Sequence, residues 1–415
     1  MNMENGFRQR PFSFWFFKPF GGNVKIEDVS ITYWRLFLMI YLWYAALVIL
    51  LFFGVKFCKV KEWNEGNMSF NQTKCFLGFC AVIIVFHHIA QDTCASWVNP
   101  RFVRHGLDIF LTAGYPMVAM FFFCSGYGLY KSARSKENFF KRYIPARIIP
   151  ILIPTILTLI VYICFRIWRD IPLNFDSPIA VNAHETWHPY VWYVPCIIYL
   201  YIIFYFGFGF SKKDWVGITI VSLGIVGYIV FCIIFAYGSW WYNTPHMFLI
   251  GILIAKYEKR FFESCKKLYI LKLLIVIALC VVFRYLGDNA GWDYLRHFHH
   301  MYTSKYATIC EVLNTVCQII YTFTFIALYY LLSMKIKLGN KVLSFLGKIT
   351  LELYLIHGIF IHMFGYYMIR EGKKPVYYIA NVPLFILVVL GLSIPISYGM
   401  SLLDKKVGQA LKPKK

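Results

Sequence analysis

The stretch Cys75–Gln91 reads CFLGFCAVIIVFHHIAQ and contains no Asp, Glu, Lys or Arg. A helix that crosses a bilayer needs about 20 mostly apolar residues, and this stretch with its flanks approaches that length. Similar blocks recur along the chain, and each must satisfy its own backbone hydrogen bonds in lipid, which requires an α-helix. The predicted spans lie at about 34–56, 75–92, 108–130, 146–166, 191–210, 215–236, 240–256, 268–287, 306–333, 343–368 and 378–403.

The composition supports the same conclusion. Of the 415 residues, 59% are hydrophobic and 15% are charged, whereas soluble globular chains carry about 25% charged residues. This balance excludes a disordered protein, an ordinary soluble enzyme and a nucleic-acid-binding domain, so we expect no nucleic-acid partner. The sequence predicts an all-α fold, a polytopic transmembrane helix bundle with about 10–11 spans, surrounded by membrane lipid.

The net charge of +22 is unevenly distributed. Connections 131–147, 256–267 and 335–348 and the C-terminal tail are rich in Lys and Arg, which by the positive-inside rule places them in the cytoplasm. We therefore predict a multi-pass protein of the plasma (inner) membrane with a cytoplasmic C-terminus. Eleven spans would place Met1 outside although the first 35 residues are basic. Either the positive-inside rule fails at the N-terminus or block 34–56 does not cross the membrane. We favour a crossing because this block is long and apolar.

The chain shows no repeat of fixed period and no low-complexity linker. We divide it into a basic polar N-terminal segment (1–33), an extra N-terminal span (34–56), a main transmembrane domain (75–403) and a basic cytoplasmic tail (404–415).

Two adjacent histidines, His87 and His88, occupy one end of the apolar block at 75–92. Ionisable groups inside a span are costly and are functional by default. A neutral imidazole can take a proton from an attacking hydroxyl as a general base. Adjacent helical residues point about 100° apart, so we expect only one of the two to face a common site. The alternative is a hydrogen-bonded pair at the membrane interface.

Several motifs occur in a characteristic order. The segment Phe76–His88 resembles the opening catalytic helix of the membrane acyltransferase-3 family, and the resemblance covers about 75–400. The other segments that resemble this family are FFFCSGYGL at 121–129, FKRYIPAR at 140–147, WYVP at 192–195 and LGKITLELYLIH at 346–357.

The chain departs from the family at one position. The usual family helix carries an arginine eleven residues before the histidine, and with His88 as that histidine the position is Leu77. Lys74 lies nearby and could extend its ammonium into the missing guanidinium's place, but as a point charge rather than a bidentate fork. If His87 is the catalytic histidine instead, Phe76 occupies the arginine position.

The resemblance implies acyl-CoA, in the commonest case acetyl-CoA, as a co-substrate on the cytoplasmic side, with no bound cofactor. It implies a sugar hydroxyl on a lipid-linked or surface glycan as the acceptor. Arg142 and Arg147 are candidates for contacting the donor's phosphates, together with Lys74. Positive-inside charge alone is the alternative explanation for the two arginines.

The predicted substrate channel contains Ser125, Trp192, Glu352 and His357. Three of these residues have a structural alternative: Ser125 and its neighbour Gly126 suit close helix packing, Glu352 suits an interhelical hydrogen bond, and Trp192 suits an interface anchor. His297, His299 and His300 match no metal motif, so we expect no metal site.

We therefore predict an integral membrane O-acyltransferase in which His88 is the base. A transporter of a polar solute is the first alternative, although neither internal repeats nor symmetric motifs support it. A family member without catalysis is the second, because Leu77 replaces the arginine.

Overall fold

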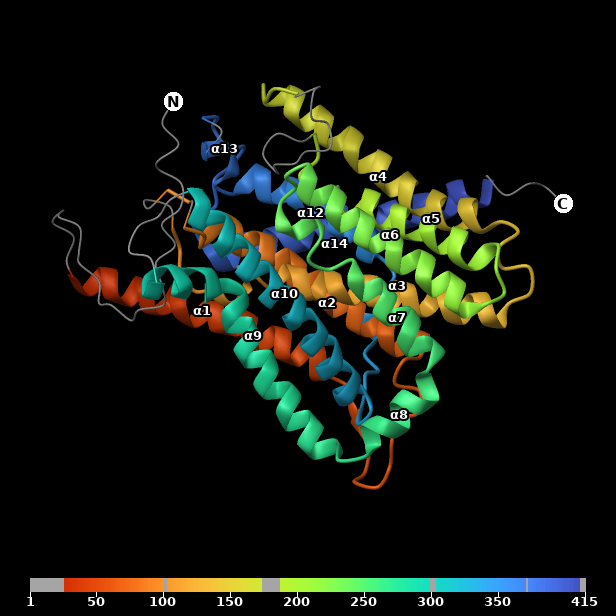
Figure 1. Ribbon diagram of the computed structural model, residues 1–415. Helices are drawn as coiled ribbons and strands as arrows, with labels where there is room; N and C mark the ends of the chain where they lie inside the picture. The colour runs from red at the N-terminus through yellow and green to blue at the C-terminus, as the bar shows by residue number, and fades with distance from the viewer. Residues whose placement is uncertain are drawn as a thin grey trace.

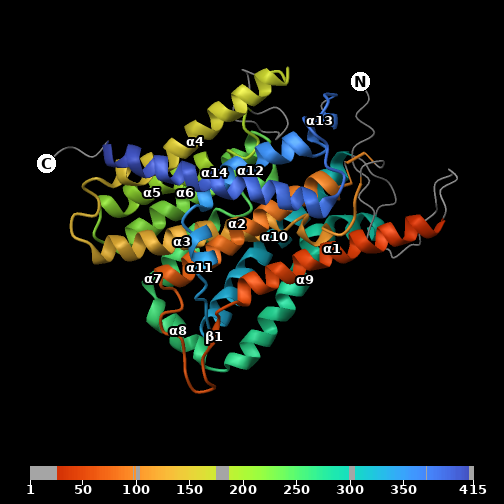
Figure 2. The ribbon, with the colours of Figure 1, turned by 180° about the vertical axis from the view of Figure 1, so that it is seen from behind.

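The computed structural model describes residues 26–96, 98–99, 103–173, 187–298, 304–370 and 372–410, and confirms an all-α helical bundle (Figures 1 and 2). The helices of the first half are α1 (Ile26–Phe52), α2 (Phe70–Thr93), α3 (Gly114–Ser135), α4 (Tyr143–Trp168), α5 (Tyr193–Gly209) and α6 (Asp214–Ile234), with a 3₁₀ turn η1 (Asp108–Phe110). Those of the second half are α7 (His246–Lys256), α8 (Glu258–Lys266), α9 (Tyr269–Phe298), α10 (Ser304–Ser333), α11 (Lys341–Leu346), α12 (Thr350–Phe364), α13 (Tyr367–Arg370) and α14 (Val382–Ala410), with a 3₁₀ turn η2 (Ser239–Trp241).

Helices α2 and α12 form the centre of the bundle. Both contact α14, α12 also packs on α4, and α2 on α3. Of the apolar window of α2, 78% is buried, against 11% for α9, which lies at the periphery with its neighbour α10 (Figure 1). The apolar residues left exposed on α6, α9 and α10 are the surface that lipid covers, because such a large exposed apolar area is incompatible with water. Polar side chains on α2 and α12 are therefore held in the interior.

In the described residues, six helices are long and apolar enough to cross a membrane: α2, α4, α6, α9, α10 and α14. Shorter apolar helices are the end of α1, α5 and α12. The predicted span 240–256 was too long, because α7 begins only at His246 and measures about 16 Å. Pro245 precedes it, and a proline is favoured at a helix start and disfavoured in its interior. The predicted span 343–368 is divided into α11 and α12 at residues 347–349.

A short antiparallel ribbon joins the connection after α1 to the connection after α10. Strand β1 (Lys56–Phe57) pairs with β2 (Ile336–Lys337).

In both views the connection from α3 to α4 and the C-terminal end of α14 lie at one end of the bundle, and the joined ends of α9 and α10 lie at the other (Figures 1 and 2). The basic connection 131–147 and the end of α14, which carries Lys405 and Lys406, therefore share one end of the molecule.

Helices α3 and α7 cross at the distance that two glycines allow. A Cβ on Gly126 would lie 2.0 Å from the carbonyl oxygen of Phe248, and a Cβ on Gly251 would lie 2.1 Å from the carbonyl oxygen of Phe123. Small residues of this kind let membrane helices bring their backbones into direct contact. Gly126 thus serves the close packing of α3 against α7, which the sequence analysis gave as the alternative to a place in a channel.

Candidate functional site

A close contact at the start of α12 brings this helix alongside α2. Gly347, in the turn between α11 and α12, lies against the backbone of α2. A Cβ on this residue would lie 2.2 Å from the carbonyl oxygen of Lys74. Only glycine fits such a contact, which explains a glycine in the motif at 346–357. From this contact α12 continues along α2 towards the two histidines.

The two helices meet through a hydrogen bond between His88 on α2 and His357 on α12. His88 Nδ1 lies 2.7 Å from His357 Nε2, and the ring planes differ by 10°. On its other side, His357 Nδ1 lies 2.9 Å from the carbonyl oxygen of Leu353. His357 is fully buried, whereas His88 is only half-buried. The sequence placed His357 in a substrate channel, but the structure places it behind His88.

A cavity of about 390 Å³ opens in front of His88. Both His87 and His88 line it, contrary to the expectation that only one would reach a common site. Of the four predicted channel residues, only Trp192 is among those that line this cavity in the described part of the chain. The other polar and aromatic residues around it are Gln91, Asp92, Thr112, Tyr115, Tyr190, Ser239, Trp240, Asn243, Gln318, Tyr354, His362 and Tyr367.

His87 is held by the segment that precedes α3. Its Nδ1 lies 2.9 Å from the carbonyl oxygen of Phe110, so Nδ1–H donates to this oxygen. Its Nε2 faces Gly114, where a Cβ would lie 2.5 Å away. The ring is thus wedged against backbone, which leaves His88 as the freer base of the pair.

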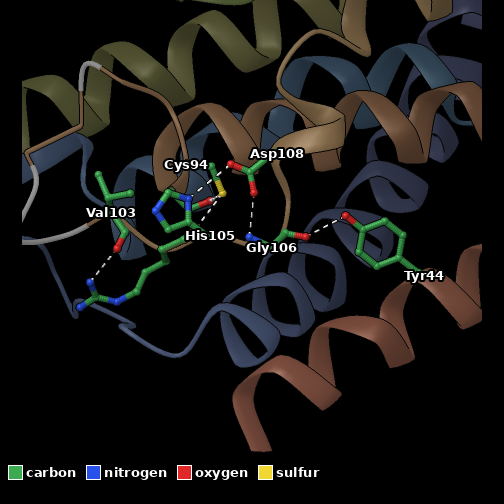
Figure 3. A network of polar contacts seen from close by, with 8 residues as sticks. Tyr44, Cys94, Val103, His105, Gly106 and Asp108 are labelled. Atoms are coloured by element: carbon green, nitrogen blue, oxygen red, sulfur yellow. Dashed lines mark hydrogen bonds and ion pairs between the residues drawn. The ribbon is translucent and has the colours of Figure 1, made fainter. Parts of the chain in front are cut away.

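The loop before Phe110 is tied to α1 (Figure 3). Tyr44 Oη donates to the carbonyl oxygen of Gly106 at 2.7 Å, and the Gly106 N–H donates to Asp108 at 2.9 Å. His105 also contacts Asp108, and this hydrogen bond raises the pKa of His105. Helix α1 therefore supports the segment that holds His87.

Three of the predicted polar residues lie towards the end of the bundle that carries the basic loop. Glu352 is in the first turn of α12, about 7.5 Å along the axis from His357. It is buried and interacts electrostatically with Lys74. Ser125 lies within interaction range of the Tyr201 hydroxyl on α5. Glu352 on α12 and Lys74 on α2 thus lie on neighbouring helices, within electrostatic range of each other.

The two predicted donor-binding arginines are at the start of α4. Arg142 is exposed at the N-cap. Arg147 is half-buried, with its guanidinium 5.4 Å from the ring centre of Phe139, and interacts electrostatically with Tyr201. Tyr201 thus lies within electrostatic range of both Arg147 and Ser125.

The histidines considered for a metal fall largely outside the described part of the chain. His299 and His300 are not described, and of His297 only the backbone is. Among the described residues, no group of three or more His, Cys, Asp or Glu side chains is placed to hold a metal ion.

Most of the cavity wall escaped the sequence analysis. The Tyr190 ring lies against His88, with ring centres 4.3 Å apart and planes tilted by 46°. Asn243 donates from Nδ2 to Gln318 Oε1 at 3.0 Å. Only Tyr190 had a usable signal, its position two residues before the WYVP motif. Asn243 and Gln318 carry no pattern in the sequence.

Two half-buried histidines that line a polar cavity inside an apolar bundle define an integral membrane protein built for chemistry or passage within the bundle. The comparison with protein families decides between these classes. A family model for an acyltransferase domain, the acyltransferase-3 model, matches residues 75–402. The chain belongs to this family and is a membrane acyltransferase, as the motifs predicted. No match was found among curated proteins or among solved structures.

Proposed function

We propose that the protein moves an acyl group, most simply acetyl, from acyl-CoA to a hydroxyl of a cell-surface or lipid-linked glycan. The observation that carries the proposal is His88, a histidine hydrogen-bonded from behind and open to a cavity in front. The cavity lies in the size range of small-molecule sites, about 300–1,000 Å³. The acyl-CoA is a co-substrate, and the mechanism needs no bound cofactor.

In the proposed reaction His88 is a general base. It takes the proton from the acceptor hydroxyl while the oxygen attacks the thioester carbonyl. The tetrahedral intermediate then loses its C–S bond, and the CoA thiolate takes the proton from the His88 imidazolium. The products are an ester and free CoA, so no net proton is consumed.

The donor enters, in this proposal, from the end of the bundle that carries the basic loop. CoA is anionic, and Arg142 and Arg147 offer charge-assisted hydrogen bonds to its phosphates. In this proposal Arg147, Tyr201 and Ser125 offer polar side chains to the extended part of CoA. By the positive-inside rule we infer that this end faces the cytoplasmic side of the plasma membrane, together with the C-terminal end of α14.

The cavity wall suits a sugar as acceptor. Trp192 and Trp240 supply flat aromatic faces, on which the C–H face of a sugar ring can pack. Asn243 Oδ1 has no hydrogen-bond partner among the described residues, so it is an acceptor for a ligand hydroxyl. Gln318 adds a second amide at the same wall.

The direct test is transfer of radiolabel from acetyl-CoA to glycan in membranes that contain the protein. We expect label in the lipid-linked or surface glycan fraction that mild alkali releases as acetate, and none in membranes without the protein. Absence of label with several acyl-CoA donors and well-inserted protein would contradict the proposal. Solute uptake by proteoliposomes would then identify a transporter, and its absence a family member without catalysis.

We predict that Arg147→Gln raises the KM for acyl-CoA by about tenfold or more, because a hydrogen bond to a charged group contributes about 1.5–3 kcal/mol. We expect kcat at saturating donor to change little. Initial rates over a range of acyl-CoA concentrations measure both.

Lys136→Gln is the matched control for Arg147→Gln. It removes the same charge from the same connection, and Lys136 is exposed. An equal rise in KM for both variants would mean that the loop attracts CoA only through its overall charge.

A further inference from the structure

The hydrogen bonds behind His88 determine which of its nitrogens carries a proton. A carbonyl oxygen only accepts, so His357 Nδ1, at 2.9 Å from the Leu353 oxygen, is protonated. In a neutral imidazole the other nitrogen is then a bare acceptor. His88 Nδ1, at 2.7 Å from His357 Nε2, must therefore be the donor.

Both rings fit this assignment as neutral imidazoles. His357 is fully buried, and its two nitrogens bond to a carbonyl oxygen and to another imidazole rather than to a carboxylate. A charged ring there would be a poorly compensated buried charge. The near-parallel planes place the Nε2 lone pair of His357 close to the plane of the His88 ring, as an N–H···N bond prefers.

The geometry points to His357 as the residue that fixes His88 in its Nδ1–H tautomer. His88 Nε2 is then left bare on the side away from His357, and it serves as the base. His357 is in this view a positioning residue, since it is fully buried behind His88. The catalytic consequence rests on the proposed acyl transfer, whereas the tautomer does not. Free neutral histidine favours the opposite form, with the proton on Nε2, so the arrangement needs a partner such as His357.

The state of His88 can be measured without any substrate. Protein labelled with ¹⁵N-histidine is purified in detergent, and the His88 signals are assigned by their loss in His88→Asn. We expect a protonated Nδ1 and a bare Nε2 in the wild type. A wild-type His88 with the proton on Nε2 would overturn the inference.

Two substitutions test the role of His357. In His357→Phe the acceptor is lost, and we expect His88 to move towards the Nε2–H form and kcat to fall about 10- to 100-fold, as for other residues that orient a functional histidine. In His357→Gln the amide oxygen can accept from His88 Nδ1–H, and we expect the Nδ1–H form and most of the activity to return. Unchanged tautomer and rate in His357→Phe would also overturn the inference.

His246→Phe is the matched control for the loss of a histidine ring inside the bundle. His246 contacts Thr322 and packs on Phe323, and none of its contacts among the described residues is with His88 or His357. We expect this variant to keep both the tautomer and the rate. A loss of activity in His246→Phe equal to that in His357→Phe, with the tautomer unchanged in both, would assign His357 a packing role only. If the Nδ1–H tautomer is found and no acyl transfer occurs in the wild type, the proposed function fails while the tautomer assignment holds.

Discussion

His88→Asn is expected to lower the rate of acyl transfer by about 10²- to 10⁴-fold, the usual contribution of a general base. Asparagine is the sharpest substitution because its side-chain N–H can replace His88 Nδ1–H as the donor to His357, while nothing replaces Nε2. The variant therefore loses the base and keeps the hydrogen bond behind it. Initial rates of label transfer from acetyl-CoA, at equal amounts of inserted protein, measure the effect.

The controls separate loss of chemistry from loss of fold. His88→Ala leaves His357 without its donor, and an unpaired buried group costs about 1–3 kcal/mol, so this variant should be less stable than His88→Asn but equally inactive. His87→Ala should have the smaller effect on the rate, because the His87 ring is wedged between Phe110 and Gly114. Full activity in His88→Asn would remove His88 from the mechanism. The reverse ranking of the two histidines would make His87 the base.

The fold was largely predictable because lipid imposes a simple rule on the sequence. Every crossing segment must be helical and apolar, so hydropathy alone located the blocks. It failed at 240–256 and at 343–368, where the apolar run continues but the helix does not. At these places Pro245 and the segment at Gly347 determine where the helix begins or is interrupted. Such single residues contribute little to a hydropathy average.

From the sequence, the candidate site residues could be predicted within each helix, but not how residues of different helices meet. The resemblance of Phe76–His88 to the family's catalytic helix pointed to His88, and counting turns along α12 separated Glu352 from His357. Neither argument could show that His357 contacts His88, since this depends on how closely two helices pack. The cavity wall comes from loops and from distant helices, and their relative positions follow from tertiary packing.

The missing arginine of the family is explained in part. Leu77 is buried in the core, so this position has no place for a solvated cation. Lys74, one turn earlier, interacts electrostatically with Glu352. A cation thus remains near the usual position, within electrostatic range of a carboxylate.

Gly126→Ala is expected to destabilise the protein by about 1–3 kcal/mol or more, the range for overpacked cores. The added methyl would lie 2.0 Å from the Phe248 carbonyl oxygen, which is backbone and cannot rotate away. Helices α3 and α7 must therefore move apart, and the neighbouring contacts loosen. Thermal unfolding in detergent, followed by loss of the monodisperse peak in size-exclusion chromatography, measures the change.

Gly128→Ala provides the matched control two residues further along the same helix. A Cβ on Gly128 meets no atom within 4 Å, so the substitution adds no clash and should leave stability equal or slightly higher, since alanine is the better helix former. Gly251→Ala should resemble Gly126→Ala, because its methyl would lie 2.1 Å from the Phe123 carbonyl oxygen. The destabilisation of the double variant should be smaller than the sum of the two single destabilisations. The first methyl already moves α3 and α7 apart, so the second methyl meets less resistance. Equal stability of Gly126→Ala and Gly128→Ala would show that α3 and α7 do not cross as closely as described.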